Sequence, residues 1–307
     1  MRFLFLFLDG VGLGSTDPSV NPFAAASLPN LQNLLGGRKF LAEAAPSAYQ
    51  RATLYALDAG LGVPGLPQSA SGQATLLTGK NIPALIGEHY GPKPNPPIAE
   101  LLQGETLFKV FLEKGYRTGL LGAYPPGYFQ VIESGRRIFS AIPMAAVNAG
   151  VRLMTKEDLY AGRALSAEFT GVGWREHLGF SDAPILSALS AGRLLGTLAQ
   201  EYEFSFFEFW LSDYVGHKQD MEQALEILQN CDNVLGGLLE VWEDEEGVIL
   251  LTSDHGNLED LSTRKHTPNL VPGLVIGSPA LRARFGDIAD LTDIAPAVLR
   301  LFEFENG

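Results

Sequence analysis

The sequence predicts an α/β protein with a doubly wound, mostly parallel sheet, helices on both faces and a small inserted lid. Three observations favour this class. Short apolar runs alternate with segments of helical periodicity along most of the 307 residues, as in parallel sheets whose crossovers are helices. The run at 3–8 is apolar at every position and stops at Asp9, which is typical of a strand buried on both faces. The hydrophobic content of 46% is sufficient for a large core.

The first 124 residues are expected to contain three strands and three helices. The strands are expected at 3–8, 51–57 and 117–121, and the helices near 28–35, at 69–78 and at 105–114. Ser27 followed by Pro29 is typical of a helix start, because proline fits the first helical turn. The helix at 105–114 is predicted because its apolar residues form one stripe. The segment 82–97 contains five prolines and is therefore expected to be a loop.

Regular alternation returns after residue 183. Helices are expected at 184–200, at 219–242 and from Thr292 onward, and strands at 204–211, 248–252 and 271–276. Between the two regular parts, residues 125–183 show weaker periodicity and only one capping-box-like helix start, at Thr155. We therefore expect an α/β core made of 1–124 and 184–307, and an inserted lid or small subdomain at 125–183.

Charge and cysteine content exclude several classes of function. The chain has 35 acidic and 22 basic residues, for a formal net charge of −13. This charge repels nucleic acid and anionic membranes, so neither is expected as a partner. A single cysteine, Cys231, excludes an internal disulfide and fits a reducing compartment. No stretch approaches the roughly 20 apolar residues of a membrane span, and the run at 3–8 is too short for a signal peptide. We therefore expect a cytoplasmic protein.

Reactive side chains follow the predicted strands at the points where the strands end. Ligands of parallel α/β sheets bind beyond the carboxyl ends of the strands, so these side chains are expected to lie together. The candidates are Asp9, Ser69, Asp213, His217, Asp254, His255 and His266. A mixed set of imidazole and carboxylate ligands suits Zn²⁺ or Mn²⁺, and a set of this size is about right for two ions.

Each motif also has an ordinary structural explanation. The Asp-Gly pair at 9–10 is compatible with a simple turn, and Asp-His-Gly-Asn at 254–257 with a β-to-α turn. A single histidine is more often a hydrogen-bonded structural residue than a ligand. The occurrence of all the motifs at strand ends favours a metal site over these separate explanations.

Together the motifs resemble those of the alkaline phosphatase superfamily, in particular its metalloenzyme branch with cofactor-independent phosphoglycerate mutase and phosphopentomutase. The resemblance covers the strand with Asp9, the segment 69–79 and residues from about 204 to 272. It implies that Ser69, ten positions before Gly79, is the nucleophile. It also implies that one ion is bound by Asp9, Ser69, Asp254 and His255, and the other by Asp213, His217 and His266.

The resemblance implies phosphoryl transfer through a phosphoserine, since a serine hydroxyl needs a base or a metal ion to become a nucleophile near neutral pH. We expect a phosphate-ester hydrolase acting on a small phosphorylated substrate, because 125–183 is small for the cap of a mutase. Two alternatives stay open: a phosphomutase acting on a phosphosugar or phosphoglycerate, and a non-catalytic metal-binding scaffold. Lys80, His89 and Lys265 are weaker candidates for substrate contacts, because surface or structural roles are more common for such residues. The sequence identifies neither the oligomeric state nor which of the two metals binds.

Overall fold

A seven-stranded sheet forms the centre of the computed structural model, which describes residues 1–303. In spatial order the strands are β2 (Ser47–Ala48), β3 (Ala52–Leu57), β7 (Val271–Ile276), β6 (Gly247–Thr252), β1 (Arg2–Leu8), β5 (Phe204–Phe209) and β4 (Thr118–Leu120). The four strands β4, β5, β1 and β6 are parallel. β7 is antiparallel to both of its neighbours, and β2 is antiparallel to β3. Five strands therefore run in one direction, and the predicted α/β class with a mostly parallel sheet is confirmed.

The two faces of the sheet have separate cores because side chains alternate along each strand. In β1, Leu4, Leu6 and Leu8 pack on one face, whereas the phenylalanines at 3, 5 and 7 pack on the other. All of these side chains are buried. This two-sided burial explains why the run at 3–8 is apolar without alternation.

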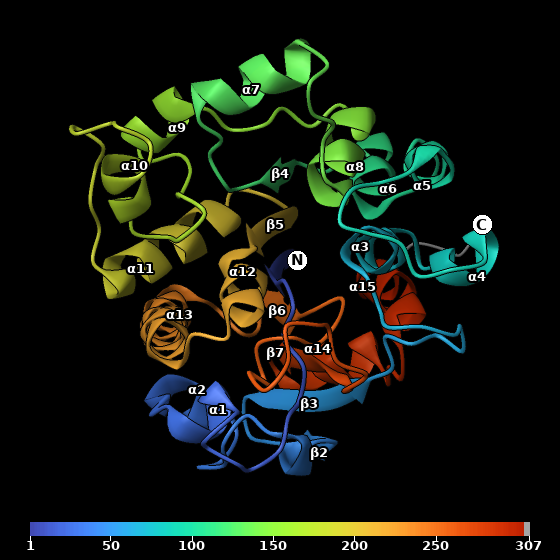
Figure 1. Cartoon of the computed structure of the whole chain (residues 1–307), viewed down its shortest axis with the longest axis vertical. Helices are drawn as coiled ribbons and strands as arrows, with labels where there is room; N and C mark the ends of the chain where they lie inside the picture. Colours follow the sequence, from blue (N-terminus) through green and yellow to red (C-terminus); the bar gives the residue numbers. More distant parts are fainter. Residues whose placement is uncertain (304–307) are drawn as a thin grey trace.

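Helices cover both faces of the sheet (Figure 1). On the leucine face lie α1 (Pro22–Ala25), α2 (Pro29–Leu34), α11 (Ala188–Ala199) and α13 (Met221–Val241). On the phenylalanine face lie α3 (Ser69–Thr78), α4 (Ile82–Ile86), α5 (Pro96–Leu101), α6 (Leu107–Glu113), α8 (Ala141–Ala149), α14 (Pro279–Phe285) and α15 (Ile294–Leu301). Two 3₁₀ turns occupy Ala42–Ala44 and Leu291–Asp293. Within residues 1–303 no helix combines the length and the apolar character that a membrane span requires.

The prediction of a loop at 82–97 was wrong, because this segment contains α4 and the start of α5. Asparagine caps both helices: the Asn81 side chain accepts a hydrogen bond from the N–H of Ala84, and the Asn95 side chain accepts one from the N–H of Ile98. Prolines stand in the first turn of each helix, where their missing N–H removes no intrahelical hydrogen bond.

The segment 125–183 forms α7 (Pro126–Glu133), α8, α9 (Lys156–Tyr160) and α10 (Val172–Glu176). The predicted helix start at Thr155 is confirmed, since Thr155 and Asp158 form a capping box. α8 packs against α3 and α6 and buries Ile142 in the core of the phenylalanine face. α7 has no buried residue. The division into a core and a lid stays a prediction.

Candidate metal centre

Asp9 lies directly after β1, at the centre of the sheet. The N–H of Asp9 donates to the carbonyl oxygen of Phe209 over 3.0 Å, which joins the ends of β1 and β5. Gly10 follows with φ of +67°, a left-handed conformation that residues with a side chain rarely adopt. A Cβ at Gly10 would lie 2.6 Å from Asp213 Oδ1. The glycine therefore allows the turn after β1 to approach Asp213 closely.

Asp213 and His217 lie one turn apart on α12 (Leu211–Lys218), a helix that the sequence analysis did not predict. His217 Nε2 is 3.3 Å from Asp213 Oδ2, and His217 Nδ1 donates to the carbonyl of Arg264 over 2.7 Å. His266 is oriented in the same way, because its Nδ1 donates to the carbonyl of Pro67 over 2.7 Å. Both rings therefore present Nε2 for coordination. Asp213, His217 and His266 offer ligand atoms within 4.8 Å of one another.

A second group surrounds His255, which follows β6. His255 Nε2 lies 3.0 Å from Ser69 Oγ, 3.3 Å from Asp9 Oδ1 and 3.7 Å from Asp254 Oδ1. All four residues are buried. Asp9 and His255 also offer ligand atoms within 4.8 Å of Asp213. The structure thus brings all seven predicted ligands into one site, with Asp213 next to both groups rather than to one.

Few hydrogen bonds offset the burial of the carboxylates of this site, although His255 lies at ion-pair distance from Asp9 and Asp254. Asp9 Oδ1 and both carboxylate oxygens of Asp254 are buried and accept no hydrogen bond from the described residues. Burial raises the pKa of Asp9 well above its ordinary value, and the charge of Asp254 raises it further. Burial also raises the pKa of Asp254. Burial opposes the charge of His255, yet Asp254 and Asp9 raise the pKa of His255 to about 10. A site with this much unbalanced negative charge fits divalent cations held by oxygen and nitrogen ligands.

Three polar side chains that the sequence analysis did not single out support these carboxylates. Asn257 Nδ2 donates to Asp213 Oδ1 over 2.7 Å, and Glu259 Oε2 accepts from the N–H of Asn257 over 2.8 Å. Gln73 Nε2 lies 3.5 Å from Asp9 Oδ2. These three residues are not candidate ligands themselves, but their hydrogen bonds fix the orientation of the candidate ligands.

Ser69 is the first residue of α3, and its hydroxyl faces the candidate ligands. Gln68, at the N-cap, provides no side-chain cap. The N–H of Ser71 donates to the carbonyl oxygen of Tyr90 over 2.9 Å. The N–H groups of Ser69 and Ala70 at the start of α3 lack an intrahelical partner, and such groups suit an anion such as phosphate. Gln73 follows four positions after Ser69, one turn along the same helix face, and this spacing is the signal that would have identified it.

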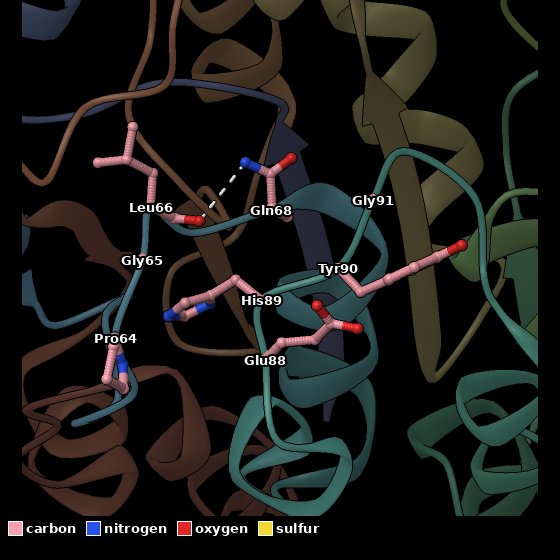
Figure 2. A pocket seen from close by; sticks show the side chains of 8 residues that line it. All are labelled: Pro64, Gly65, Leu66, Gln68, Glu88, His89, Tyr90 and Gly91. Carbon is pink, nitrogen blue, oxygen red and sulfur yellow. Dashed lines mark hydrogen bonds between the residues drawn. The ribbon is translucent and has the colours of Figure 1, made fainter.

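A surface cleft of about 370 Å³ begins beside the start of α3. Its walls are residues 64–66 with Gln68 on one side and residues 88–91 on the other, and Figure 2 shows His89 directed between the walls and Tyr90 directed away from them. A Cβ at Gly91 would lie 3.2 Å from the backbone N of Ser69. The second wall of the cleft therefore abuts the residue predicted to be the nucleophile.

The three weaker candidates for substrate contacts do not join the ligand group. Lys80 is exposed beyond the C-terminal end of α3, about 15 Å along the helix from its first residue. His89 Nε2 is 3.2 Å from two carbonyl oxygens of the loop 60–63, so it braces that loop at the edge of the cleft. Lys265 is exposed beside His266.

The fold is an α/β fold of the alkaline phosphatase type, and the site is a candidate metal centre. The alkaline phosphatase from the Antarctic bacterium TAB5 aligns with a TM-score of 0.56 and 12% identity, over 99% of both chains. The PH0037 protein from Pyrococcus horikoshii aligns with a TM-score of 0.59 and 15% identity, over 100% of this chain and 98% of that chain. At such identities the likeness shows the fold alone.

Residues 187–306 match the model of the metalloenzyme superfamily. Over this segment the resemblance to the alkaline phosphatase superfamily is confirmed. The 2,3-bisphosphoglycerate-independent phosphoglycerate mutase of Pseudomonas fluorescens Pf-5 is 32% identical over 109 residues, which are 33% of this chain and 21% of that protein. The mutase of Acetivibrio thermocellus is 34% identical over 113 residues, 34% of this chain and 22% of that protein. The chain spans about a fifth of the length of these curated relatives, so their activity is not established for it.

Proposed function

We propose that this protein is a two-metal phosphate-ester hydrolase that acts through a phosphoserine at Ser69. One observation carries the proposal: Ser69 Oγ lies 3.0 Å from His255 Nε2, beside buried Asp9 Oδ1 and both carboxylate oxygens of Asp254, which accept no hydrogen bond from the described residues. A hydroxyl in this position is close to every candidate ligand of one ion and at the positive end of a helix. A merely structural serine has no need of either feature.

Two divalent ions, Zn²⁺ or Mn²⁺, would be held by the residues that the site collects. We assign Asp9, Ser69, Asp254 and His255 to one ion, and Asp213, His217 and His266 to the other. Asp213 lies next to both groups and is therefore the residue best placed to couple them. When bound, the ions supply positive charge that lowers the pKa of the serine hydroxyl and stabilises the transferred phosphate.

The residues of the chain account for the bond changes. Ser69 Oγ loses its proton to solvent and attacks phosphorus, so that an Oγ–P bond forms while the bond from phosphorus to the ester oxygen breaks. The leaving oxygen takes up a proton. The N–H groups of Ser69 and Ala70, at the start of α3, hold phosphate oxygens during this step. Water then attacks the phosphoserine, which releases inorganic phosphate and restores the Ser69 hydroxyl.

The alternative is a phosphomutase, in which a hydroxyl of the retained product attacks the phosphoserine instead of water. The mutase relatives support this alternative. A mutase needs a cover that excludes water and keeps the intermediate bound. We propose 125–183 as the lid over a core of 1–124 and 184–307, but α8 of this segment packs into the core and leaves little chain to cover the site. This favours hydrolysis.

Turnover of p-nitrophenyl phosphate by metal-loaded wild type and Ser69→Ala tests the proposal. We expect the variant to lose at least about 10³-fold in kcat, with the metal content checked by elemental analysis. Ser71→Ala is the matched control on the same helix, since Ser71 Oγ contacts the backbone of Gln68 and Tyr90; we expect it to lose less than about tenfold. Equal rates in wild type and Ser69→Ala, with metal bound, would leave only the scaffold explanation.

Product analysis separates the two reactions. A phosphorylated substrate that yields free phosphate indicates hydrolysis, whereas a rearranged ester without release indicates a mutase. The proposal has three further parts that rest on the composition and on the family resemblance. They are a small phosphorylated substrate, no nucleic-acid partner and a cytoplasmic location.

A further inference from the structure

Three of the seven candidate ligands lie on one long loop. Residues 253–270 connect β6 to β7 and carry these three, His266 among them, yet within this stretch there is no helix or strand. One isolated backbone bridge joins the two sides of the loop, between Gly256 and Thr267. Where a buried loop has no ladder of backbone hydrogen bonds, side chains have to satisfy its backbone groups. The position of His266 relative to the other ligands therefore depends on side-chain contacts of this loop.

Glu259 is part of this loop and is 1% exposed. Its Oε2 accepts hydrogen bonds from the N–H groups of Gly12 and Asn257, each over 2.8 Å. Its Oε1 accepts one from the hydroxyl of Thr267 and, over 3.0 Å, one from Asn269 Nδ2. All four donors are neutral, and each carboxylate oxygen has two of them. This carboxylate is therefore occupied by the fold and is not available as a metal ligand.

Glycines make room for the Glu259 carboxylate. A Cβ at Gly12 or at Gly256 would collide with Glu259 Oε1. Glu259 thus joins three segments at one point: the turn after β1, the turn after β6 and the stretch before β7. Each of these segments carries at least one candidate ligand, so the carboxylate holds parts of the metal centre together that no strand or helix connects.

The links from Glu259 are most direct to the ligands of one ion. Asn257, whose N–H donates to Glu259, also donates through Nδ2 to Asp213 Oδ1 over 2.7 Å. Thr267 directly follows His266 in the chain. The candidate ligands of the other ion depend less on Glu259, because they lie on α3 or within three residues of the end of β1 or β6.

We propose that Glu259 is a positioning residue that sets the affinity of the ion assigned to Asp213, His217 and His266, which we call the second ion, without touching it. This inference rests on the proposed function, because it assumes that two ions bind. Without the carboxylate, two buried N–H groups and a hydroxyl lose their acceptor, so the loop has to relax. His266 then moves, and so does Asn257, which orients Asp213. Loss of a contact that supports a ligand lowers metal affinity by about 10- to 100-fold.

Calorimetric titration of metal-free protein with Mn²⁺ tests the inference without any measurement of turnover. We expect wild type to bind two ions, and His217→Ala to identify the second ion as the binding event that it abolishes. Glu259→Ala should weaken this same event at least about tenfold and leave the other within about threefold. Asp232→Ala is the matched control, because Asp232 is also buried and accepts from backbone N–H groups but supports no candidate ligand. It should destabilise the fold and leave both binding events unchanged.

Two further variants separate positioning from a loss of folding. Thr267→Val removes one donor and keeps the shape of the side chain, so it should weaken only the second ion, by about threefold or more, even if Glu259→Ala does not fold. Glu259→Gln keeps an oxygen for both backbone N–H groups and an NH₂ that donates to Thr267 once its hydroxyl turns. It should therefore restore most of the affinity lost in Glu259→Ala. No recovery would show that the charge of Glu259 acts rather than its hydrogen bonds, and would overturn the inference.

The metal dependence of turnover gives an independent measurement. With p-nitrophenyl phosphate, Glu259→Ala should need at least about tenfold more Mn²⁺ for half its maximal rate, and should come within about fivefold of the wild-type kcat at saturating Mn²⁺.

Two unchanged binding events in Glu259→Ala, or equal weakening of both, would overturn the inference, while two ions in wild type would still support the metal site of the proposed function. A wild type that binds no Mn²⁺ would refute that metal site, and the inference with it.

Discussion

Two buried aspartates of this protein, Asp232 and Asp254, differ in whether their carboxylates accept hydrogen bonds. Asp232 accepts hydrogen bonds from the N–H of Leu31 over 2.8 Å and from the backbone and side chain of Asn30 over 3.1 and 2.9 Å. Asp254 accepts none from the described residues, although it is fully buried. A buried charge is costly unless it is paired in the fold, and unpaired buried charges are typical of sites that bind a ligand or an ion. Asp232 is paired in the fold, whereas Asp254 accepts no hydrogen bond from the described residues, as its proposed role as a metal ligand requires.

In the metal-free protein, Asp254→Asn should therefore stabilise the fold. Burial raises the pKa of Asp254, so its ionised form is less favourable in the folded than in the unfolded chain. We expect the free energy of unfolding at neutral pH to rise by about 1–2 kcal/mol, as measured by urea denaturation. The sign follows from linkage: the gain is present above the raised pKa and disappears as pH falls below the ordinary value of 3.8, where the carboxyl is protonated in both states.

Asp232→Asn is the matched control and should act in the opposite direction. The amide retains one acceptor but turns an NH₂ group toward the N–H donors of α2, so we expect a loss of about 2–3 kcal/mol. If Asp254→Asn destabilised the metal-free protein as much as Asp232→Asn, the carboxylate of Asp254 would have a structural partner, and its assignment as a ligand would lose its main support.

The proximity of the seven candidate ligands could be predicted from the sequence, because each follows a strand or opens a helix at the same edge of the sheet. The position of Asp213 between the two groups could not, since it depends on the glycine turn after Asp9 and on the bond from Asn257. The roles of all these residues as ligands stay predictions.

At the scale of elements, the approach of α3 to the turn after β6 determines whether the serine reaches the metal centre. Gly72 lies in the middle of α3, and a Cβ there would be 2.9 Å from both the Cβ and the carbonyl oxygen of Asp254. Real side chains do not approach so closely, and the obstacle includes backbone, so the helix would have to shift. Glycine at position 72 therefore lowers the helix propensity of α3 but allows the helix to pack closely against Asp254.

Gly72→Ala should lower activity although alanine is the better helix former. We expect a loss of about 10²-fold or more in kcat for p-nitrophenyl phosphate, because a displacement of about 1 Å at a reacting group has that effect. Gly127→Ala in α7 is the control, since a Cβ there meets nothing within 4 Å; it should leave the kcat unchanged and the melting temperature equal or slightly higher. Full activity of Gly72→Ala would show that the position of α3 does not limit the chemistry.

Most core elements were predictable because burial on both faces leaves long apolar runs, as in β1 and β6. The short helices α4 and α5 were not, since prolines that begin a helix look the same in sequence as prolines that form a loop. α12 was not predicted because it has only eight residues. Two of them, Asp213 and His217, are polar candidate ligands, so the segment shows no clear apolar stripe. The antiparallel direction of β7 could have been predicted from the sequence. No helix is predicted between 252 and 271, and the connection between two neighbouring parallel strands almost always contains one.

At the scale of the whole molecule, the metal centre joins segments that are far apart in the sequence. Its candidate ligands come from the ends of β1 and β6, from α3 and α12, and from the loop before β7, and these elements pack on both faces of the sheet. Bound ions would therefore link the sheet to helices of both layers. They would also supply local positive charge to a chain whose net charge is −13.

Removal of metal should consequently destabilise the whole fold rather than one loop. A ligand present at about 100 times its Kd stabilises the native state by about 2.7 kcal/mol, which for a chain of this size corresponds to a rise in Tm of roughly 4 °C. We expect chelation to lower the Tm by this amount and to abolish phosphatase activity, and Zn²⁺ or Mn²⁺ to restore both. In Asp254→Asn the metal-dependent rise in Tm should be much smaller, because a ligand is lost. A protein that keeps its Tm and activity after elemental analysis shows it free of metal would contradict the two-metal site, since the unpaired carboxylates would then be stable without cations.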